Sequence, residues 1–171
     1  VKSIKNVGSC DNAYLTYIIQ NYDELPDVVH FRKGTFSDVA NENKFKCKSC
    51  IQKPDILNFK IRRWKFTNNP SQHHLKFVSS PYDNLGDWAR SDGPIHADDY
   101  EKQWCNIRYG GNFSASRDQI RNVPLSVYKN LHSQQTHANA EIDHFIERSW
   151  GVMLCSDTIR SRHDTSTSNQ K

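Results

Sequence analysis

Residues 138–153 read ANAEIDHFIERSWGVM, and this stretch has the strongest secondary-structure signal in the chain. Its apolar side chains recur mainly at intervals of three and four residues, the spacing that gathers side chains on one face of an α-helix. On a helical wheel that face holds Ala138, Ile142, Phe145, Ile146 and Met153, with Trp150 at its border. The stretch therefore predicts an amphipathic helix that packs its apolar face against the rest of the domain.

A helix and a strand are expected near the start of the chain. Apolar side chains recur at helical spacing over residues 9–22, and Ser9, Asp11 or Asn12 is expected to cap the first turn of that helix. Residues 27–31 predict a short buried strand. A helix followed directly by a strand is typical of α/β domains.

The region before the last helix continues this pattern. Residues 112–115 predict a second short strand, and Ser116 is expected to cap the helical turn that follows it. That turn ends before Pro124, and residues 125–131 predict a further helical segment.

The middle of the chain has a less regular pattern. Residues 56–66 and 74–78 predict strands, whereas residues 83–99 predict an ordered surface loop without long elements. A chain of 171 residues fits one domain. We expect that domain to cover residues 1–155 and to be followed by a polar, flexible tail, residues 156–171, which is rich in Ser, Thr, Arg, Asp and Asn.

Composition excludes several classes of protein. Hydrophobic residues make up 36% of the chain and charged residues 25%, and four Trp, seven Tyr and eight Phe supply bulky core material. No apolar run reaches the roughly 18 residues that a membrane helix needs, so membrane insertion is not expected. The net charge of +4 is spread along the chain, and nucleic acid is therefore not expected as a partner.

The cysteines predict a reducing environment. The count of five is odd, so they cannot all pair within one chain. Cys47 and Cys50 form the only C-x-x-C, and a zinc site there would need ligands from distant parts of the chain. We therefore expect reduced, partly buried thiols and a cytoplasmic protein.

Carboxylates on the last predicted helix are candidates for acid–base chemistry. Asp143 and Glu147 are one turn apart beside the apolar face, where partial burial disfavours ionisation and raises the pKa of a carboxyl group. The alternative is that Glu147 caps a neighbouring element or pairs with a lysine. Glu141, His144 and Arg148 share another face, which predicts a solvated strip of ion pairs.

A candidate metal site follows Gly93 and Pro94. His96, Asp98 and Asp99 could hold Mg²⁺ or Mn²⁺ bridging phosphates, because these ions prefer oxygen ligands. The alternative is that the two aspartates begin a helix, where they complement its dipole.

A candidate phosphate site lies before the predicted turn at 116. Gly110 and Gly111 permit close backbone approach, free N–H groups at the helix start can bind phosphate oxygens, and Arg117 adds positive charge. The alternative is that the glycines only shape a turn.

Several of these segments together resemble a known family. They are NVG at 6–8, NYDELPD at 21–27, GGNFSASR at 110–117 and FIERSWG at 145–151, with a looser match at LGDW, 85–88. In this combination the chain resembles a family of formerly uncharacterised domains from fungi, algae and large DNA viruses, which is similar to GT-A glycosyltransferases.

The resemblance implies a single α/β domain with a mostly parallel central sheet flanked by helices. It implies transfer of a sugar from a nucleotide-sugar donor to a protein or glycan hydroxyl, with Mn²⁺ or Mg²⁺ as the metal. Glu147 would be the catalytic base, with Asp143 or Glu141 as alternates. Arg117 and Arg148 would hold phosphate or orient the carboxylate.

The chain also departs from this family in two places. Relatives carry a further strand–loop unit before the NVG segment, so we expect that unit to be lacking here. Many GT-A enzymes hold their metal through Asp-x-Asp after a buried strand, and here Arg32-Lys33-Gly34 follows Phe31.

Two alternative functions follow. A catalytically silent relative would act as a binding or structural component of a larger complex, for instance a virion. A metal-finger nuclease is the less favoured alternative, because EIDH at 141–144 is similar to the motif of those enzymes but lies in a helical rather than a hairpin pattern.

Overall fold

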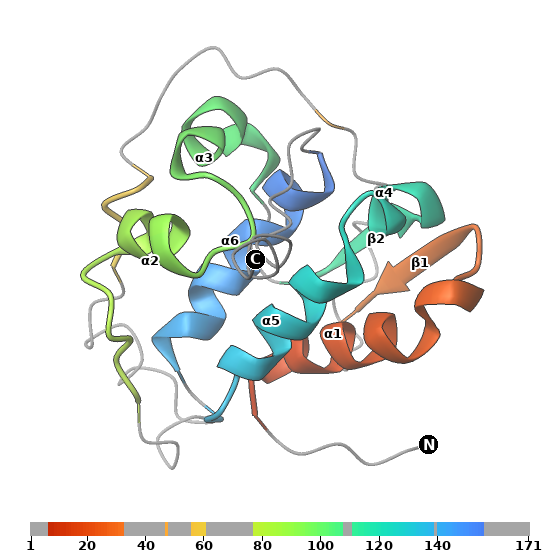
Figure 1. Ribbon diagram of the computed structural model, residues 1–171, viewed down its shortest axis with the longest axis horizontal. Coiled ribbons are helices and arrows are strands. Elements are labelled where there is room, and N and C mark those ends of the chain that lie inside the picture. The colour runs from red at the N-terminus through yellow and green to blue at the C-terminus, as the bar shows by residue number, and fades with distance from the viewer. Residues whose placement is uncertain are drawn as a thin grey trace, which may run out of the picture.

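The computed structural model describes residues 7–32, 47, 56–60, 77–107, 111–138 and 140–155. Within them, helices dominate and two short strands pair (Figure 1). The helices are α1 (Ser9–Asn21), α2 (Leu85–Ser91), α3 (Ala97–Gln103), α4 (Arg117–Arg121), α5 (Leu125–Gln134) and α6 (Glu141–Leu154), with 3-10 turns η1 (Tyr22–Glu24) and η5 (Trp104–Asn106). The strands are β1 (Val28–Phe31) and β2 (Phe113–Ser116).

Helix α6 is the centre of the molecule. In Figure 1 it runs through the middle, with α2 and α3 on one side and α1, α5 and the strands on the other. The predicted helix is confirmed, but it is covered on all sides: only His144, Glu147 and Arg148 are less than fully buried. The predicted solvated strip is therefore wrong, since Glu141 is 1% exposed and Arg148 is largely covered.

Aromatic side chains join α6 to the other elements. The ring of Trp150 lies 5.3 Å from that of Phe113 on β2, and Phe113 lies 4.8 Å from Phe31 on β1. Tyr14 of α1 packs 4.9 Å from Phe31. The Trp150 indole N–H donates a hydrogen bond of 2.6 Å to the buried Asp11 carboxylate, which ties the start of α1 to the end of α6.

The α/β class is confirmed in outline, but the predicted parallel central sheet is not present in the described residues. The sheet there has two strands, β1 and β2, which are antiparallel with Val28 opposite Ser116 and Phe31 opposite Phe113. A single parallel bridge, Val78 to Ala140, lies outside it.

Residues 56–60 show why one of the predicted strands does not form there. The Phe59 N–H bonds to the Ile56 carbonyl at 3.0 Å, which closes a turn. The carbonyls of Phe59 and Leu57 then accept the N–H groups of Leu85 and Gly86 at the start of α2, at 2.9 and 2.8 Å. This segment therefore satisfies a helix terminus instead of pairing as a strand. Residues 61–66 and 74–76 of the predicted strands lie outside the described residues.

The predicted surface loop at 83–99 is also wrong. It contains all of α2 and the start of α3, each seven residues long. The Asn84 side chain caps α2 by accepting the Asp87 N–H at 2.9 Å. Leu85, Trp88 and Ala89 are buried at helical spacing, but two turns are too few for this periodicity to stand out from the sequence.

The two predicted caps differ in outcome. Ser116 is confirmed, because its Oγ accepts the Gln119 N–H at 3.1 Å while Gln119 Oε1 accepts the Ser116 N–H at 3.0 Å. At α1, none of the expected side chains forms a cap, and the N-cap is Gly8 with φ 65°.

The prediction of reduced thiols is wrong for three cysteines. Cys47 forms a disulfide with Cys155 at the end of α6, and Cys105 is also disulfide-bonded. Cys10 is not part of a disulfide and is half-buried. These bonds remove the basis for expecting a cytoplasmic protein and a zinc site at Cys47.

Among the described residues, no helix is long and apolar enough to span a membrane. The tail at 156–171 lies outside the described residues, so the predicted boundary at 155 stays a prediction.

Candidate functional site

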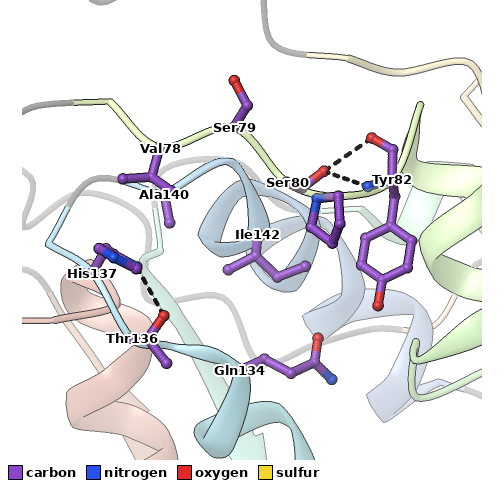
Figure 2. A pocket seen from close by; sticks show the side chains of 10 residues that line it. Val78, Ser79, Ser80, Tyr82, Gln134, Thr136, His137, Ala140 and Ile142 are labelled. Carbon is purple, nitrogen blue, oxygen red and sulfur yellow. Dashed lines mark hydrogen bonds between the residues drawn. The ribbon is translucent and has the colours of Figure 1, made fainter.

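A hollow of about 290 Å³ opens where α5 ends and α6 begins. Figure 2 shows it from close by, with Ile142 lying between His137 on one side and Tyr82 on the other. Its lining residues are Val78, Ser79, Ser80, Pro81, Tyr82, Gln134, Thr136, His137, Ala140 and Ile142. The floor is apolar and the rim carries hydroxyl groups and an imidazole, which is the usual make-up of a small-molecule site.

Glu141 anchors the 78–80 segment, which forms one wall of this hollow. Its backbone N–H donates to the Val78 carbonyl at 2.9 Å, and its carboxylate accepts the Ser80 N–H at 3.0 Å. The carboxylate is buried and lies in the first turn of α6, where negative charge complements the helix dipole. Predicted as an alternate catalytic base, Glu141 holds the 78–80 segment against α6, and its side chain does not line the hollow.

The opposite wall is held by polar groups that bond to the scaffold. The Tyr82 hydroxyl donates to the Asp92 carboxylate. The Gln134 amide donates to the Asp92 carbonyl at 3.0 Å and accepts the Trp88 indole N–H at 2.7 Å. This wall is therefore fixed in place before any ligand arrives.

His137 is the titratable group on the rim. Its Nδ1 lies 2.8 Å from the Thr136 hydroxyl, and its backbone carbonyl accepts the Gly8 N–H at 3.0 Å. Both side chains are exposed. The other ring nitrogen, Nε2, has no hydrogen-bond partner among the described residues and can exchange a proton with a bound molecule.

Asp143 lies behind this rim. It is 4% exposed, and its two carboxylate oxygens accept the Ala140 N–H at 3.3 Å and the Gln135 amide at 3.4 Å. Burial raises the pKa of Asp143 to about 6, against the smaller lowering effects of those hydrogen bonds and of the nearby His144 and His137 charges. The predicted raised pKa on α6 is thus present, at Asp143, and the charge of His137 has the smallest of the lowering effects on it.

Glu147 occupies a different face of α6. Its side chain is 17% exposed and lies 3.5 Å from the Arg148 guanidinium and 3.9 Å from His144. Arg148 stacks 3.5 Å over the Phe59 ring and donates to the His144 carbonyl at 2.8 Å. The lining of the hollow at the start of α6 includes neither Glu147 nor Arg148, and the arrangement matches the alternative in which Glu147 forms an ion pair, here with an arginine rather than a lysine.

Arg117 is held by the chain itself. Its guanidinium donates to the Leu25 carbonyl at 2.6 Å and pairs with the Asp27 carboxylate at 2.8 Å. These bonds fix the turn before β1. Gly111 has φ 73° and lies at the approach to β2, a backbone conformation that favours glycine, and Gly110 lies outside the described residues.

The predicted metal ligands begin a helix, as the alternative interpretation predicts. His96 is the N-cap residue of α3, and Asp98 and Asp99 lie in its first turn. Asp99 is 3.8 Å from Lys102. The described residues hold no group of three His, Cys, Asp or Glu side chains that could bind a metal, so no ligand set for Mg²⁺ or Mn²⁺ is completed there.

Sequence reasoning missed the residues that form the hollow. Ser79, Ser80 and Tyr82 lie in an irregular segment and Thr136 and His137 in the loop between α5 and α6, so no periodicity marks them. The available signal was that these polar residues lie in segments without regular periodicity, where binding residues are often found, and that one of these segments comes just before the candidate carboxylate Asp143.

Comparison with protein-family models, with curated proteins and with solved structures found no match to this chain.

Proposed function

We propose that the chain is a glycosyltransferase that binds its acceptor hydroxyl in the hollow at the start of α6. The observation that carries this proposal is the hollow itself, with the imidazole of His137 on its rim; the buried carboxyl of Asp143, whose pKa is raised, is close enough to feel the charge of that imidazole weakly. The family resemblance supplies the reaction class. The geometry favours this pair over Glu147 as the source of base chemistry.

The lining of the hollow suits a sugar. Ile142, Ala140 and Val78 provide an apolar floor for the C–H face of a ring. The hydroxyl groups of Ser79 and Thr136 stand at the exposed rim, within reach of hydroxyl groups on a ligand. A volume of about 290 Å³ lies at the small end of ligand pockets, which favours one sugar ring over a long oligosaccharide.

The proton transfer follows from the hydrogen bonding of His137. In the tautomer whose Nδ1–H donates to the Thr136 hydroxyl, 2.8 Å away, the ring presents Nε2 as an acceptor. Nε2 takes the proton of the acceptor hydroxyl while the oxygen forms a bond to the anomeric carbon of the donor. The bond from that carbon to the phosphate oxygen breaks, and the nucleoside diphosphate leaves with the electron pair. The Asp143 carboxylate stabilises the imidazolium until it releases its proton to water.

A catalytically silent binding protein is the second candidate. It is favoured by the ion pair of Glu147 with Arg148, which occupies the carboxylate that the family resemblance names as the base. In that case the hollow binds a sugar without turnover. The nuclease alternative loses its support, because the 141–144 motif lies on a helix and its Glu141 is used by the scaffold.

The disulfides bear on where this function operates. Disulfides persist in oxidising compartments and are rare in the cytosol. With Cys47 and Cys155 bonded and Cys105 also in a disulfide, we infer that the chain works in an oxidising compartment or outside the cell.

The test measures nucleoside diphosphate released from a panel of nucleotide sugars, with mono- and disaccharide acceptors, by the full chain. We expect His137→Gln to lower turnover more than tenfold, the usual range for loss of a general base, without changing the melting temperature. His96→Gln is the matched control, because this exposed histidine lies outside the hollow.

Two results would overturn parts of the proposal. Wild-type turnover by His137→Gln, together with loss of turnover by Glu147→Gln, would move the base to Glu147. A saturable increase in melting temperature with a sugar, but no release from any donor, would leave the silent binding protein.

A further inference from the structure

A second hollow, of about 460 Å³, lies between α1 and β1. Every residue from Val28 to Arg32 lines it, together with Pro26 and with Tyr14 and Tyr17 on α1. Successive side chains of a strand point to opposite faces, so a hollow over one face of β1 would meet only every second residue. This hollow therefore runs along an edge of β1, with α1 as its far wall. In Figure 1, β2 lies along one side of β1 and α1 along the other.

The hydrogen bonds between the strands show which backbone groups face that edge. The Arg117 N–H donates to the Asp27 carbonyl at 3.0 Å, and these two residues continue the antiparallel register of β1 and β2. Hydrogen-bonded and non-hydrogen-bonded pairs alternate along an antiparallel ladder. Every second residue from Asp27 onward therefore bonds to β2, whereas Val28 and His30 direct their N–H and C=O groups to the outer edge of β1, away from β2.

Two further contacts support this alternation. The Ser116 N–H is bonded to Gln119 Oε1 at 3.0 Å instead of to Val28, which lies opposite Ser116. Nδ1 of His30 is only 2.7 Å from the Ser114 hydroxyl, and side chains approach most closely in non-hydrogen-bonded pairs. The backbone groups of Val28 and His30 have no hydrogen-bond partner among the described residues. The outer edge thus offers two donors and two acceptors.

These backbone groups define what the hollow can bind. The groups of Val28 and His30 repeat about 6.6 Å apart, at about 3.3 Å per residue, which is the repeat at which another extended chain presents its own N–H and C=O groups. Because α1 walls the far side, the hollow suits a single extended segment. The β1 strand of a second copy would bring its own α1 and β2 into the same space.

Apolar side chains line the wall of the hollow that faces the core. Tyr14, Val29 and Phe31 border the hollow and belong to the hydrophobic core, and the ring of Tyr14 lies 4.9 Å from that of Phe31. The side chain of His30 leaves the opposite face of β1 and is exposed. A segment paired with β1 would direct alternate side chains to the apolar wall and to solvent, so we expect alternating apolar and polar residues in it.

We propose that the outer edge of β1 binds an extended peptide segment of another protein, which adds to the sheet as a third strand between β1 and α1. Backbone hydrogen bonds to Val28 and His30 supply the affinity, and the apolar wall selects alternate side chains. The proposal does not rest on the proposed transferase function, because the two hollows have no lining residue in common.

The first experiment measures amide hydrogen exchange by NMR in the full, oxidised chain without a ligand. We expect the amides of Val28 and His30 to exchange at least about tenfold faster than those of Val29 and Phe31, because only the second pair bonds to β2. Equal protection of all four amides would overturn the proposal, since the outer edge would then be covered already by this chain or by a second copy.

The second experiment adds a capped seven-residue peptide in which valine and threonine alternate, with one lysine at each end for solubility. We expect saturable binding that slows exchange at Val28 and His30 and leaves Val29 and Phe31 unchanged, because only the outer edge gains hydrogen bonds. His137→Gln should bind this peptide like the wild-type chain, which separates the site from the proposed active site.

A pair of variants at one position isolates the backbone contribution. Val28→Pro removes one N–H from the outer edge, at the first residue of an edge strand, where proline is tolerated. Val28→Ala is the matched control, because it also shortens the side chain but keeps the N–H. We expect Val28→Pro to bind the peptide about fivefold more weakly than Val28→Ala, as one hydrogen bond is lost. Thermal melting shows whether both variants fold, and the exchange measurements on the wild-type chain do not depend on them.

Three results of the peptide experiments would overturn the proposal. The first is no binding at millimolar peptide. The second is binding that leaves exchange at Val28 and His30 unchanged. The third is equal affinity of folded Val28→Pro and Val28→Ala, because the peptide would then not pair with this edge.

Discussion

Replacing Asp143 with asparagine should remove a large part of the pH dependence of stability. The wild-type carboxyl has an ordinary pKa of 3.8 and a folded pKa of about 6, raised by burial. Between these values the folded chain binds more protons at this site than the unfolded chain does. Stability contributed by the protonated carboxyl is therefore complete below pH 3.8 and is lost as the pH rises to about 6.

The magnitude follows from the size of the shift. About two pKa units correspond to about 3 kcal/mol, and little solvent screening applies because the side chain is 4% exposed. The asparagine side chain stays neutral, so the Asp143→Asn variant should gain about 3 kcal/mol on the wild-type chain between pH 4 and pH 7. Asparagine also replaces one acceptor oxygen with an NH₂ group, which then faces the Gln135 amide or the Ala140 N–H. Two donors facing each other destabilise the fold, but this cost is the same at every pH.

The assay is urea unfolding followed by tryptophan fluorescence at intervals from pH 4 to pH 7, with the four tryptophans as reporters. The comparison between the two proteins at each pH cancels the other groups that titrate, apart from His137 and His144 where they couple to Asp143. Parallel curves of unfolding free energy for the two proteins would refute the reasoning, because Asp143 would then ionise as if it were in water.

Two further predictions concern the scaffold. Replacing Cys47 and Cys155 with serine should lower the unfolding free energy by up to about 4–5 kcal/mol, because the disulfide closes a loop across 108 residues. A loss below about 1 kcal/mol, measured by urea unfolding, would contradict a stabilising role for this bond. Gly8→Ala should destabilise by about 2 kcal/mol, because φ is +65° and the new Cβ would lie 2.8 Å from Cβ of Asn12, an atom fixed to the backbone of α1; an unchanged melting temperature would show that this turn is not held as described.

The elements with strong local signals could be predicted from the sequence. The helices at α1, α5 and α6 and the strands β1 and β2 all fall where periodicity and turn residues put them. The way these elements pair could not be predicted, because the direction of β1 against β2 depends on contacts between segments more than 80 residues apart. The short helix α2 was missed because it has only two turns of pattern, and the start of α3 was predicted only as the alternative to a metal site at Asp98 and Asp99.

The candidate site, like the fold, could be predicted from the sequence only in part. The sequence indicated a carboxyl of raised pKa on the last helix, and Asp143 has it. It could not show that Glu141 anchors a neighbouring segment or that Glu147 faces Arg148, because both depend on which side of α6 each covering segment lies. The disulfide between Cys47 and Cys155 was equally hidden, since an odd cysteine count is compatible with either redox state.

The most direct test of the central claim is an NMR titration that follows the imidazole signals of His137 as sugars and nucleotide sugars are added. A ligand bound in the hollow at the start of α6 should shift these signals in a saturable way, together with the amide signals of Thr136 and Ser79. Saturable binding that leaves all three unchanged, or no binding by any sugar in the panel, would contradict the claim that this hollow is the functional site.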